Sequence, residues 1–324
     1  MTSARDETAP VTALVLDVTA RVWPFFLLVA AGVVLTRLRL LDARMAQGLS
    51  TYVYWIGFPA LLVHSLARLG RPEPELWAGL AAYAGVGLMV MGALMACGRL
   101  LGWSREERAG AAMASGIGNS AFLALPVTAA VLGAETARLV AGAVAADFVV
   151  LAAAGVALLG WASGRSIWRA TAQAFWNPVV AAALLGLLLA LLDFALPEPL
   201  DRAVGMAAAS GSPVGLVALG AALGLRQAED TPAPTRTPIL VAALAKLAAF
   251  PLLVWLAIGL TPAPVAFRAG ATLVAAAPTA VNVFIQTRAY GVWPRGAARI
   301  VALTTAVSIV SLSLVAILLT ARVS

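Results

Sequence analysis

SGIGNSAFLALPV, residues 115–127, places two glycines, an asparagine and a proline inside a long apolar segment. Pro126 has no backbone N–H, and its ring clashes with the preceding helical turn, so it leaves a carbonyl without its helical partner. Gly116 and Gly118 make the backbone permissive, and Asn119 adds an amide donor and an acceptor at the same depth. The stretch therefore predicts a helix that is broken in its middle.

The composition places this break inside a membrane. The chain of 324 residues is 62% hydrophobic and 11% charged, with a mean hydropathy of +0.94. Soluble domains average about 45–50% apolar and about 25% charged residues, so lipid has to cover much of this chain. The net charge of +7 does not indicate nucleic-acid binding, because the arginines lie in short gaps between apolar runs, where they act as topology signals.

A spanning helix needs about 20 mainly apolar residues, and the chain divides into ten such segments separated by short polar gaps. They lie near residues 15–36, 45–67, 76–98, 107–132, 137–161, 173–193, 202–224, 237–259, 265–288 and 297–320. The gaps are too short for a soluble domain. We expect an all-α integral membrane protein with a single transmembrane domain over residues 1–324 and broken fourth and ninth helices.

The prolines suggest an internal duplication. Three prolines of the first half have counterparts in the second half: Pro24 with Pro178, Pro59 with Pro213, and Pro126 with Pro278. The first two pairs share an offset of 154 residues. They predict one repeat over about residues 15–161 and a second over about 173–320. Because five spans are an odd number, the second repeat would be inverted, which is a common plan for secondary transporters.

The arginines also predict the orientation. The gaps after the first, third, fifth, seventh and ninth segments, together with the adjoining segment ends, hold 13 arginines, and the other gaps and segment ends with both termini hold 8. Because basic residues accumulate on the cytoplasmic side, we expect both termini to be periplasmic in a bacterial inner membrane. An even number of spans agrees with this expectation.

A second stretch, AAAPTAVNVFIQTRAYG at residues 275–291, repeats the ingredients of the first break. Two polar interruptions at matching places of inverted halves indicate a substrate site near the membrane midplane. The candidate site residues are Gly118, Asn119, Pro126, Pro278, Thr279, Asn282 and Gln286. The alternative for the polar members is a hydrogen bond that only holds neighbouring helices together.

Asp147 and Lys246 are the ionisable residues placed most deeply in apolar runs, and Lys246 is the only lysine. A charge at the membrane centre costs about 2.5–3.5 kcal/mol on insertion scales, so each is expected to face a cavity or a partner. Two roles stay open: mutual neutralisation, or a part in coupling or substrate binding. Asp17 and Arg21, four residues apart, are expected to form a peripheral ion pair.

Together the motifs GNSAFLALP, followed by Gly133, and PTAVNVFIQTRAYG resemble the paired crossover motifs of the auxin efflux carrier family. The resemblance covers nearly the whole chain. It implies a secondary transporter of organic acid anions, with Asn119 and Pro126 at the first crossover and Pro278 at the second. It also implies a scaffold of the first, second, sixth and seventh helices and a moving, elevator-type transport part. The chain lacks the long central loop of the plant hormone exporters, which favours a bacterial-type carrier of small carboxylates.

Other classes of protein remain as alternatives. A channel or a sodium-coupled organic-anion symporter would have a similar composition. An intramembrane hydrolase would need a serine, such as Ser115 or Ser210, beside a histidine base, and His64 is the only histidine. The sequence contains neither an HExxH zinc motif nor a nucleotide-binding loop, so we expect no enzyme, metal or cofactor. The expected partners are a small carboxylate and the lipid bilayer, with a homodimer through the scaffold helices as an option.

Overall fold

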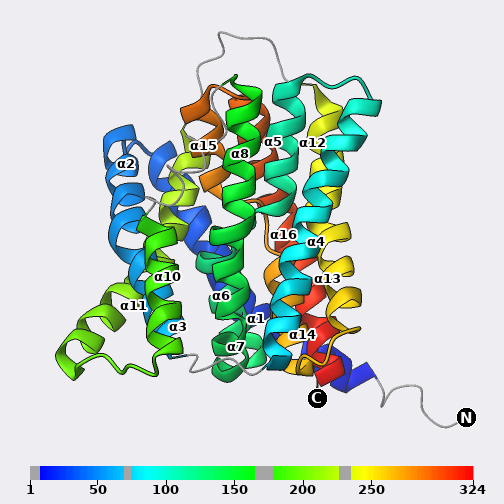
Figure 1. Cartoon of the computed structure of the whole chain (residues 1–324). Helices are drawn as coiled ribbons and strands as arrows, with labels where there is room; N and C mark the ends of the chain where they lie inside the picture. The colour runs from blue at the N-terminus through cyan, green and yellow to red at the C-terminus, as the bar shows by residue number, and fades with distance from the viewer. Residues whose placement is uncertain (1–7, 69–73, 165–177, 226–234, 324) are drawn as a thin grey trace, which may run out of the picture.

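The computed structural model describes residues 8–68, 74–164, 178–225 and 235–323, and within them the chain is helical (Figure 1). The α-helices are α1 (Thr8–Arg37), α2 (Ala43–Tyr52), α3 (Phe58–Ala67), α4 (Pro74–Leu100), α5 (Arg105–Gly116), α6 (Leu125–Leu132), α7 (Ala134–Ala146), α8 (Ala152–Ala162), α10 (Pro178–Leu191), α11 (Glu198–Gly224), α12 (Arg236–Leu244), α13 (Phe250–Ile258), α14 (Val265–Ala275), α15 (Val281–Tyr290) and α16 (Pro294–Val323). Four π-helical turns adjoin them: η1 (Val53–Gly57), η2 (Ser120–Ala124), η3 (Asp147–Leu151) and η4 (Ala245–Ala249).

Seven helices in the described part of the chain are long and apolar enough to cross a membrane, counting helices that continue through a π-helical turn. They are Leu16–Arg37, Ala43–Ala67, Pro74–Leu100, Ala134–Ala162, Glu198–Gly224, Arg236–Ile258 and Pro294–Thr320. Three further apolar helices are shorter: Ser120–Leu132, Ala181–Leu191 and Val265–Ala275. The prediction of an all-helical membrane protein is confirmed.

Both predicted helix interruptions are present. α5 ends at Gly116 and the chain becomes helical again at Ser120, where η2 leads into α6. α14 ends at Ala275, and α15 begins at Val281. Because of these interruptions, the predicted fourth and ninth segments contain only short apolar helices, Ser120–Leu132 and Val265–Ala275.

The helices pack in two groups. In the first group, α11 contacts α1, α2 and α3, and α3 also contacts α10; the remaining helices mostly contact each other. In Figure 1, α2, α3, α10 and α11 lie on the left, and α4, α12 and α13 lie on the right. The first group contains the segments that the family resemblance assigns to a scaffold.

Glycines allow α1 and α11 to approach closely. A Cβ atom added to Gly220 would lie 1.9 Å from the carbonyl oxygen of Val29, and one added to Gly32 would lie 2.2 Å from that of Val217. Small residues of this kind let the backbones of membrane helices meet. The α1–α11 contact therefore depends on the absence of side chains at these two positions.

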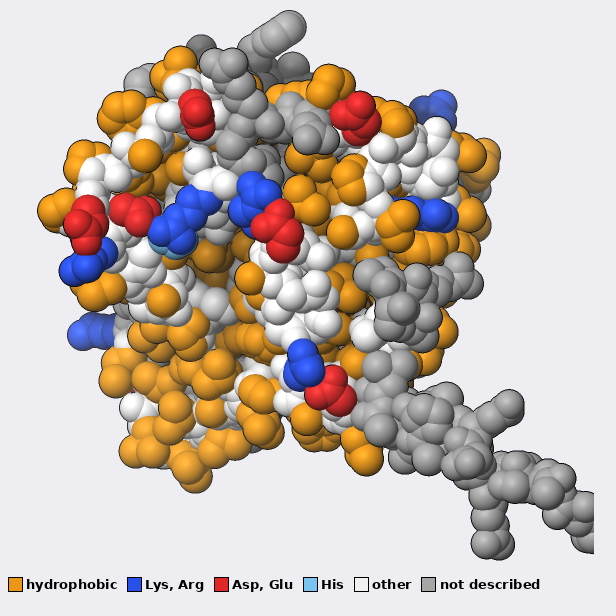
Figure 2. Space-filling view, turned by 90° about the horizontal axis from the view of Figure 1, so that it is seen from below, with side chains coloured by type: hydrophobic (Ala, Val, Ile, Leu, Met, Phe, Trp, Pro, Cys, Tyr) orange, Lys and Arg blue, Asp and Glu red, His pale blue; other side chains and the backbone are white. Residues whose placement is uncertain are grey.

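Large apolar side chains are exposed on the outer surface, among them Trp55, Leu188 and Val310. Figure 2 views the molecule from below and shows many hydrophobic side chains, with acidic and basic side chains lying close to one another among them. Contiguous exposed apolar surface of this kind is typical of a membrane-facing protein.

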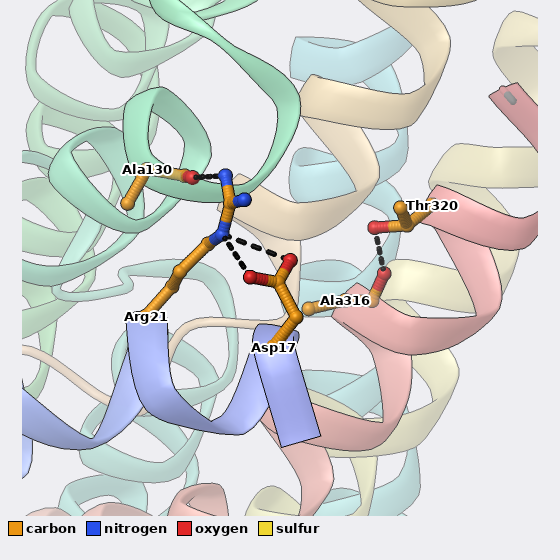
Figure 3. A network of polar contacts seen from close by, with 5 residues as sticks. All are labelled: Asp17, Arg21, Ala130, Ala316 and Thr320. Atoms are coloured by element: carbon orange, nitrogen blue, oxygen red, sulfur yellow. Dashed lines mark hydrogen bonds and ion pairs between the residues drawn. The ribbon is translucent and has the colours of Figure 1, made fainter. Parts of the chain in front are cut away.

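α1 begins and α16 ends at the lower face of Figure 1. The predicted pair Asp17–Arg21 is present in α1, with 3.0 Å between Arg21 Nε and Asp17 Oδ2. Arg21 Nη1 also donates a hydrogen bond of 2.9 Å to the carbonyl oxygen of Ala130, in α6 (Figure 3). The pair therefore connects α1 to the second half of the broken helix, a contact that the sequence did not predict.

Candidate functional site

The two helix interruptions cross and pair with each other. The backbone N–H of Asn119 donates to the carbonyl oxygen of Pro278 at 2.7 Å, and the N–H of Ala280 donates to that of Ile117 at 3.2 Å. These bonds form an antiparallel bridge between Gly118 and Thr279. Backbone groups in a membrane need partners, and here the two breaks satisfy one another.

Thr279 fastens this crossing to two neighbouring helices. Its hydroxyl donates a 2.9 Å hydrogen bond to the carbonyl oxygen of Ala114 near the end of α5. Its backbone N–H donates to Thr304 Oγ1 of α16 at 3.1 Å. The side chain is buried and engaged within the protein.

A cavity of about 90 Å³ lies beside the crossing, between the two groups of helices. Its lining consists of Ser50, Val53, Tyr54, Phe58, Gly118, Asn119, Ser120, Ala121, Phe122, Phe148, Gly215, Ala218, Leu219, Ala280, Val281, Asn282 and Ile285. Most of these residues are apolar, and a few polar groups converge, as is common in small-molecule sites. The described lining contains no charged side chain.

The lining brings together three of the predicted site residues and leaves out four. Gly118, Asn119 and Asn282 line the cavity. The other four occupy the crossing or the helices that lead away from it: Pro126, Pro278, Thr279 and Gln286. Of these, Pro278 supports the site through its carbonyl oxygen, which accepts the bond from Asn119.

Sequence reasoning missed the wall of the cavity opposite the crossing. Ser50, Tyr54 and Gly215 come from α2, η1 and α11, far from either break in the sequence. Phe58 packs against Phe122 with ring centroids 4.4 Å apart. A single serine, tyrosine, glycine or phenylalanine on an otherwise regular helix carries no local signal that would have separated it from ordinary helix packing.

Two helix N-termini face the cavity. Ser120, Ala121 and Phe122 form the first turn of η2, and Val281 and Asn282 begin α15. No side chain caps either N-terminus. First-turn N–H groups have no partner within their own helix and carry a partial positive charge, so together they suit an anion.

The C-terminus of α14, which carries a partial negative charge, already has a cationic partner in the ammonium group of Lys246. Lys246, in η4, is fully buried, and its Nζ donates a 2.8 Å hydrogen bond to the carbonyl oxygen of Ala275, the last residue of α14. The same Nζ lies 4.6 Å from the ring centroid of Phe250. A Cβ atom on Gly118 would come within 2.9 Å of it, so the ammonium packs directly against the crossing.

Asp147 lies next to this region, at the start of η3, and is 1% exposed. The hydroxyl of Tyr83 donates to its Oδ1 at 2.8 Å, and within the described residues its Oδ2 has no hydrogen-bond partner. Asp147 and Lys246 are close enough for each charge to act on the other. None of the ion pairs between described residues joins them directly.

Comparison with known proteins agrees with a role in transport. A family model described as "Membrane transport protein" matches residues 17–167 and 161–316. A protein of Rhizobium meliloti (strain 1021) described as "Putative malonate transporter" is 29% identical over 310 residues, which cover 92% of this chain and 94% of the relative.

Proposed function

Because the chain belongs to the membrane transport protein family, to which the auxin efflux carriers also belong, we propose that it is a secondary carrier of small organic acid anions. The family and the matching relative are transporters and not enzymes. The relative's description includes malonate, so the substrate class that we propose is a short dicarboxylate.

One observation carries this proposal: two uncapped helix N-termini and two asparagine side chains meet in one cavity whose described lining has no carboxylate. A substrate carboxylate would accept hydrogen bonds from first-turn N–H groups and from the amides of Asn119 and Asn282. Charge-assisted bonds of this kind are about twice as strong as neutral ones. A cation would meet the positive ends of two half-helices and find no compensating charge.

The proposed architecture has ten spans in two inverted repeats, over about residues 15–161 and 173–320, with the protein in a bacterial inner membrane and both termini in the periplasm. The cavity lies between the two groups of helices. If the group that contains the crossing moves relative to α1, α2, α3, α10 and α11, the cavity opens alternately to each side of the membrane. This is an elevator-type form of alternating access. A homodimer would form through the scaffold helices.

We also propose that the carrier works without bound sodium. The buried ammonium of Lys246 already provides the positive charge at the end of α14, where a bound cation would otherwise be favourable. Because Lys246 already occupies the end of α14, sodium binding there is less favourable, and the sodium-coupled alternative is less suited to this protein.

The hydrolase alternative is set aside. The hydroxyl of Ser115 donates to the carbonyl oxygen of Ala112 at 2.8 Å, and that of Ser210 lies 2.5 Å from the hydroxyl of Tyr52. His64 Nδ1 lies 3.6 Å from Asp201 Oδ1. Among the described residues no hydrogen bond joins either serine to His64, so the arrangement of a serine beside a histidine base is not formed, in agreement with the family.

The test is concentrative uptake into proteoliposomes. Purified protein is reconstituted, and labelled malonate is supplied under an imposed proton gradient or membrane potential. A carrier coupled to a gradient accumulates malonate beyond the electrochemical equilibrium of the anion, whereas a channel stops at that equilibrium. Empty liposomes and the double variant Asn119→Ala/Asn282→Ala are the controls. If malonate, succinate and acetate are neither accumulated nor raise the unfolding temperature of the protein, the proposed function is wrong.

A further inference from the structure

Asp147 and Lys246 form a buried charged cluster that the proposed binding mode does not use. Asp147 lies in η3 and Lys246 in η4, and both side chains are buried. The hydroxyl of Tyr83, in α4, donates to Asp147 Oδ1 at 2.8 Å, whereas Oδ2 has no hydrogen-bond partner among the described residues. Oδ2 is therefore the oxygen atom of this carboxyl group at which a proton meets no competing donor.

Ser120 connects this cluster to the candidate cavity. It is the first residue of η2 and lines the cavity, and it lies close enough to Asp147 to act on its carboxylate. Its hydroxyl donates a long hydrogen bond of 3.5 Å to the carbonyl oxygen of Gly118. Because a hydroxyl can rotate between neighbouring acceptors, Ser120 offers a path for a proton between the cavity and Asp147.

Lys246 places its positive charge directly behind the cavity wall. Its Nζ donates to the carbonyl oxygen of Ala275 at 2.8 Å, and a Cβ atom on Gly118, which lines the cavity, would lie 2.9 Å from the same Nζ. Lys246 and Asp147 act on one another's charge without a direct ion pair between them. The ionisation of Asp147 therefore decides how much of the ammonium charge is left uncompensated beside the cavity.

Other titratable groups of the described chain lie away from Asp147. η3 packs against α4, α5, α7, α8 and α10, and it contacts α3 through a pair of phenylalanine rings. The described residues of α8 and α10 include no titratable side chain. Apart from Tyr83, the titratable residues of the remaining four helices lie toward helix ends: His64, Glu75, Cys97, Arg99, Arg105, Glu106, Glu107, Arg108, Glu135 and Arg138. Tyr54 is the only titratable residue in the described lining of the cavity. Within the described chain, Asp147 is thus faced by Tyr83, Ser120 and Lys246.

We propose that Asp147 binds a cotransported proton, and that its protonation favours anion binding in the cavity because it leaves the charge of Lys246 uncompensated. The inference rests on the proposed function. When Asp147 is ionised, its charge offsets that of the ammonium. When Oδ2 carries a proton, a net positive charge remains behind Gly118, and a carboxylate in the cavity compensates it. Proton and anion then bind cooperatively, and each raises the affinity for the other by the same factor. A carrier that crosses the membrane with both and returns with neither uses a proton gradient to accumulate the anion.

The test compares the wild type with Asp147→Asn, which imitates the protonated carboxyl group. The wild-type affinity for malonate is expected to fall about fivefold or more as the pH rises, at the lower end of typical coupling between sites, whereas Asp147→Asn keeps the high affinity throughout. Both proteins meet the same ionic forms of malonate at each pH, so the difference between them comes from the protein. In proteoliposomes held at zero membrane potential, an inward proton gradient makes the wild type accumulate malonate. Asp147→Asn is expected to exchange external for internal malonate without accumulating it.

Three further variants separate coupling from misfolding. Lys246→Met removes the ammonium, so its malonate affinity at low pH is expected to be about fivefold weaker or more and to lose the pH dependence. Tyr83→Phe keeps both charges and removes only the hydrogen bond that stabilises the ionised carboxylate. The pH at which malonate affinity falls is then expected to rise by about one unit, which tests the proposal even if Asp147→Asn folds poorly. Glu75→Gln removes an exposed carboxylate at the start of α4 and is the matched control, with wild-type accumulation.

Three results would overturn the proposal. The first is proton-driven accumulation by Asp147→Asn equal to that of the wild type, which would mean that the proton travels on malonate. The second is native malonate affinity in Lys246→Met, and the third is an unshifted pH profile in Tyr83→Phe. If the wild type neither binds nor exchanges malonate, the proposed function is wrong and the coupling proposal falls with it. If the wild type exchanges malonate but does not respond to the proton gradient, only the coupling proposal fails.

Discussion

Asn119 and Asn282 are the side chains on which substrate binding should depend most. Both line the cavity beside a half-helix N-terminus, and a hydrogen bond to a charged group contributes about 1.5–3 kcal/mol. Asn119→Ala or Asn282→Ala is therefore expected to weaken malonate binding about tenfold or more. Isothermal titration of purified protein measures this loss.

Gln286 provides the matched control because it is also an amide on α15 but is absent from the described cavity lining. Gln286→Ala should keep wild-type affinity. If Asn119→Ala and Asn282→Ala both retain native affinity, the substrate binds elsewhere and the two asparagines only hold helices together.

Asp147 and Lys246 should behave as one electrostatic unit. Both are buried, and each acts on the charge of the other. Asp147→Asn or Lys246→Met leaves one buried charge uncompensated, whereas the double variant removes both, so it should be less damaging than the sum of the single changes. The unfolding temperature in detergent, measured for all four proteins, gives the coupling. Strictly additive losses would mean that the two groups stabilise the fold independently.

Lys246 also leads to a prediction about ions. If its ammonium takes the place of a bound cation at the end of α14, replacing external sodium with choline should leave malonate uptake unchanged. Uptake is compared at equal osmolarity and membrane potential. Accumulation that stops without sodium would instead favour the sodium-coupled symporter.

At the level of helices, the breaks could be predicted because they come from local backbone chemistry. Glycine and proline act on the residues next to them, so residues 115–127 and 275–291 were sufficient to locate both interruptions. The π-helical turns η1 and η4 end two residues before Pro59 and Pro251, whereas η3 has no proline close by, and none of these three turns was predicted. The partner of each break also could not be read from its own residues, because the bonds join backbone groups that almost every residue has.

The contact between α1 and α11 provides a test at this level. Gly220→Ala would place a methyl group 1.9 Å from the carbonyl oxygen of Val29, so the two helices would have to separate. We expect a lower unfolding temperature and less folded protein. Gly92→Ala in α4 is the matched control, because a Cβ atom there meets nothing within 4 Å. Equal stability of the two variants would show that the close approach of α1 and α11 contributes little.

For the whole molecule, the testable property is orientation. The first described helix begins and the last ends at the same face (Figure 1), as an even number of spans requires, and the arginine distribution predicts that this face is periplasmic. A periplasmic reporter enzyme fused after Ser324 is expected to be active, and a fluorophore that matures only in the cytoplasm should stay dark. The reverse pattern would invert the proposed topology.

Composition, spacing and local breaks were enough to establish that the chain is helical and membrane-embedded, and to predict where its helices are interrupted. These properties depend on the average polarity of about 20 consecutive residues or on the backbone of a few. Only the folded chain showed three further features. Ser50 and Gly215 line the cavity, Lys246 donates a hydrogen bond to the carbonyl oxygen of Ala275, and the Thr279 hydroxyl donates one to the carbonyl oxygen of Ala114 in α5. Each joins residues distant in the sequence through backbone groups or small side chains, whose chemistry is the same at many positions and selects a partner only once packing has brought the helices together.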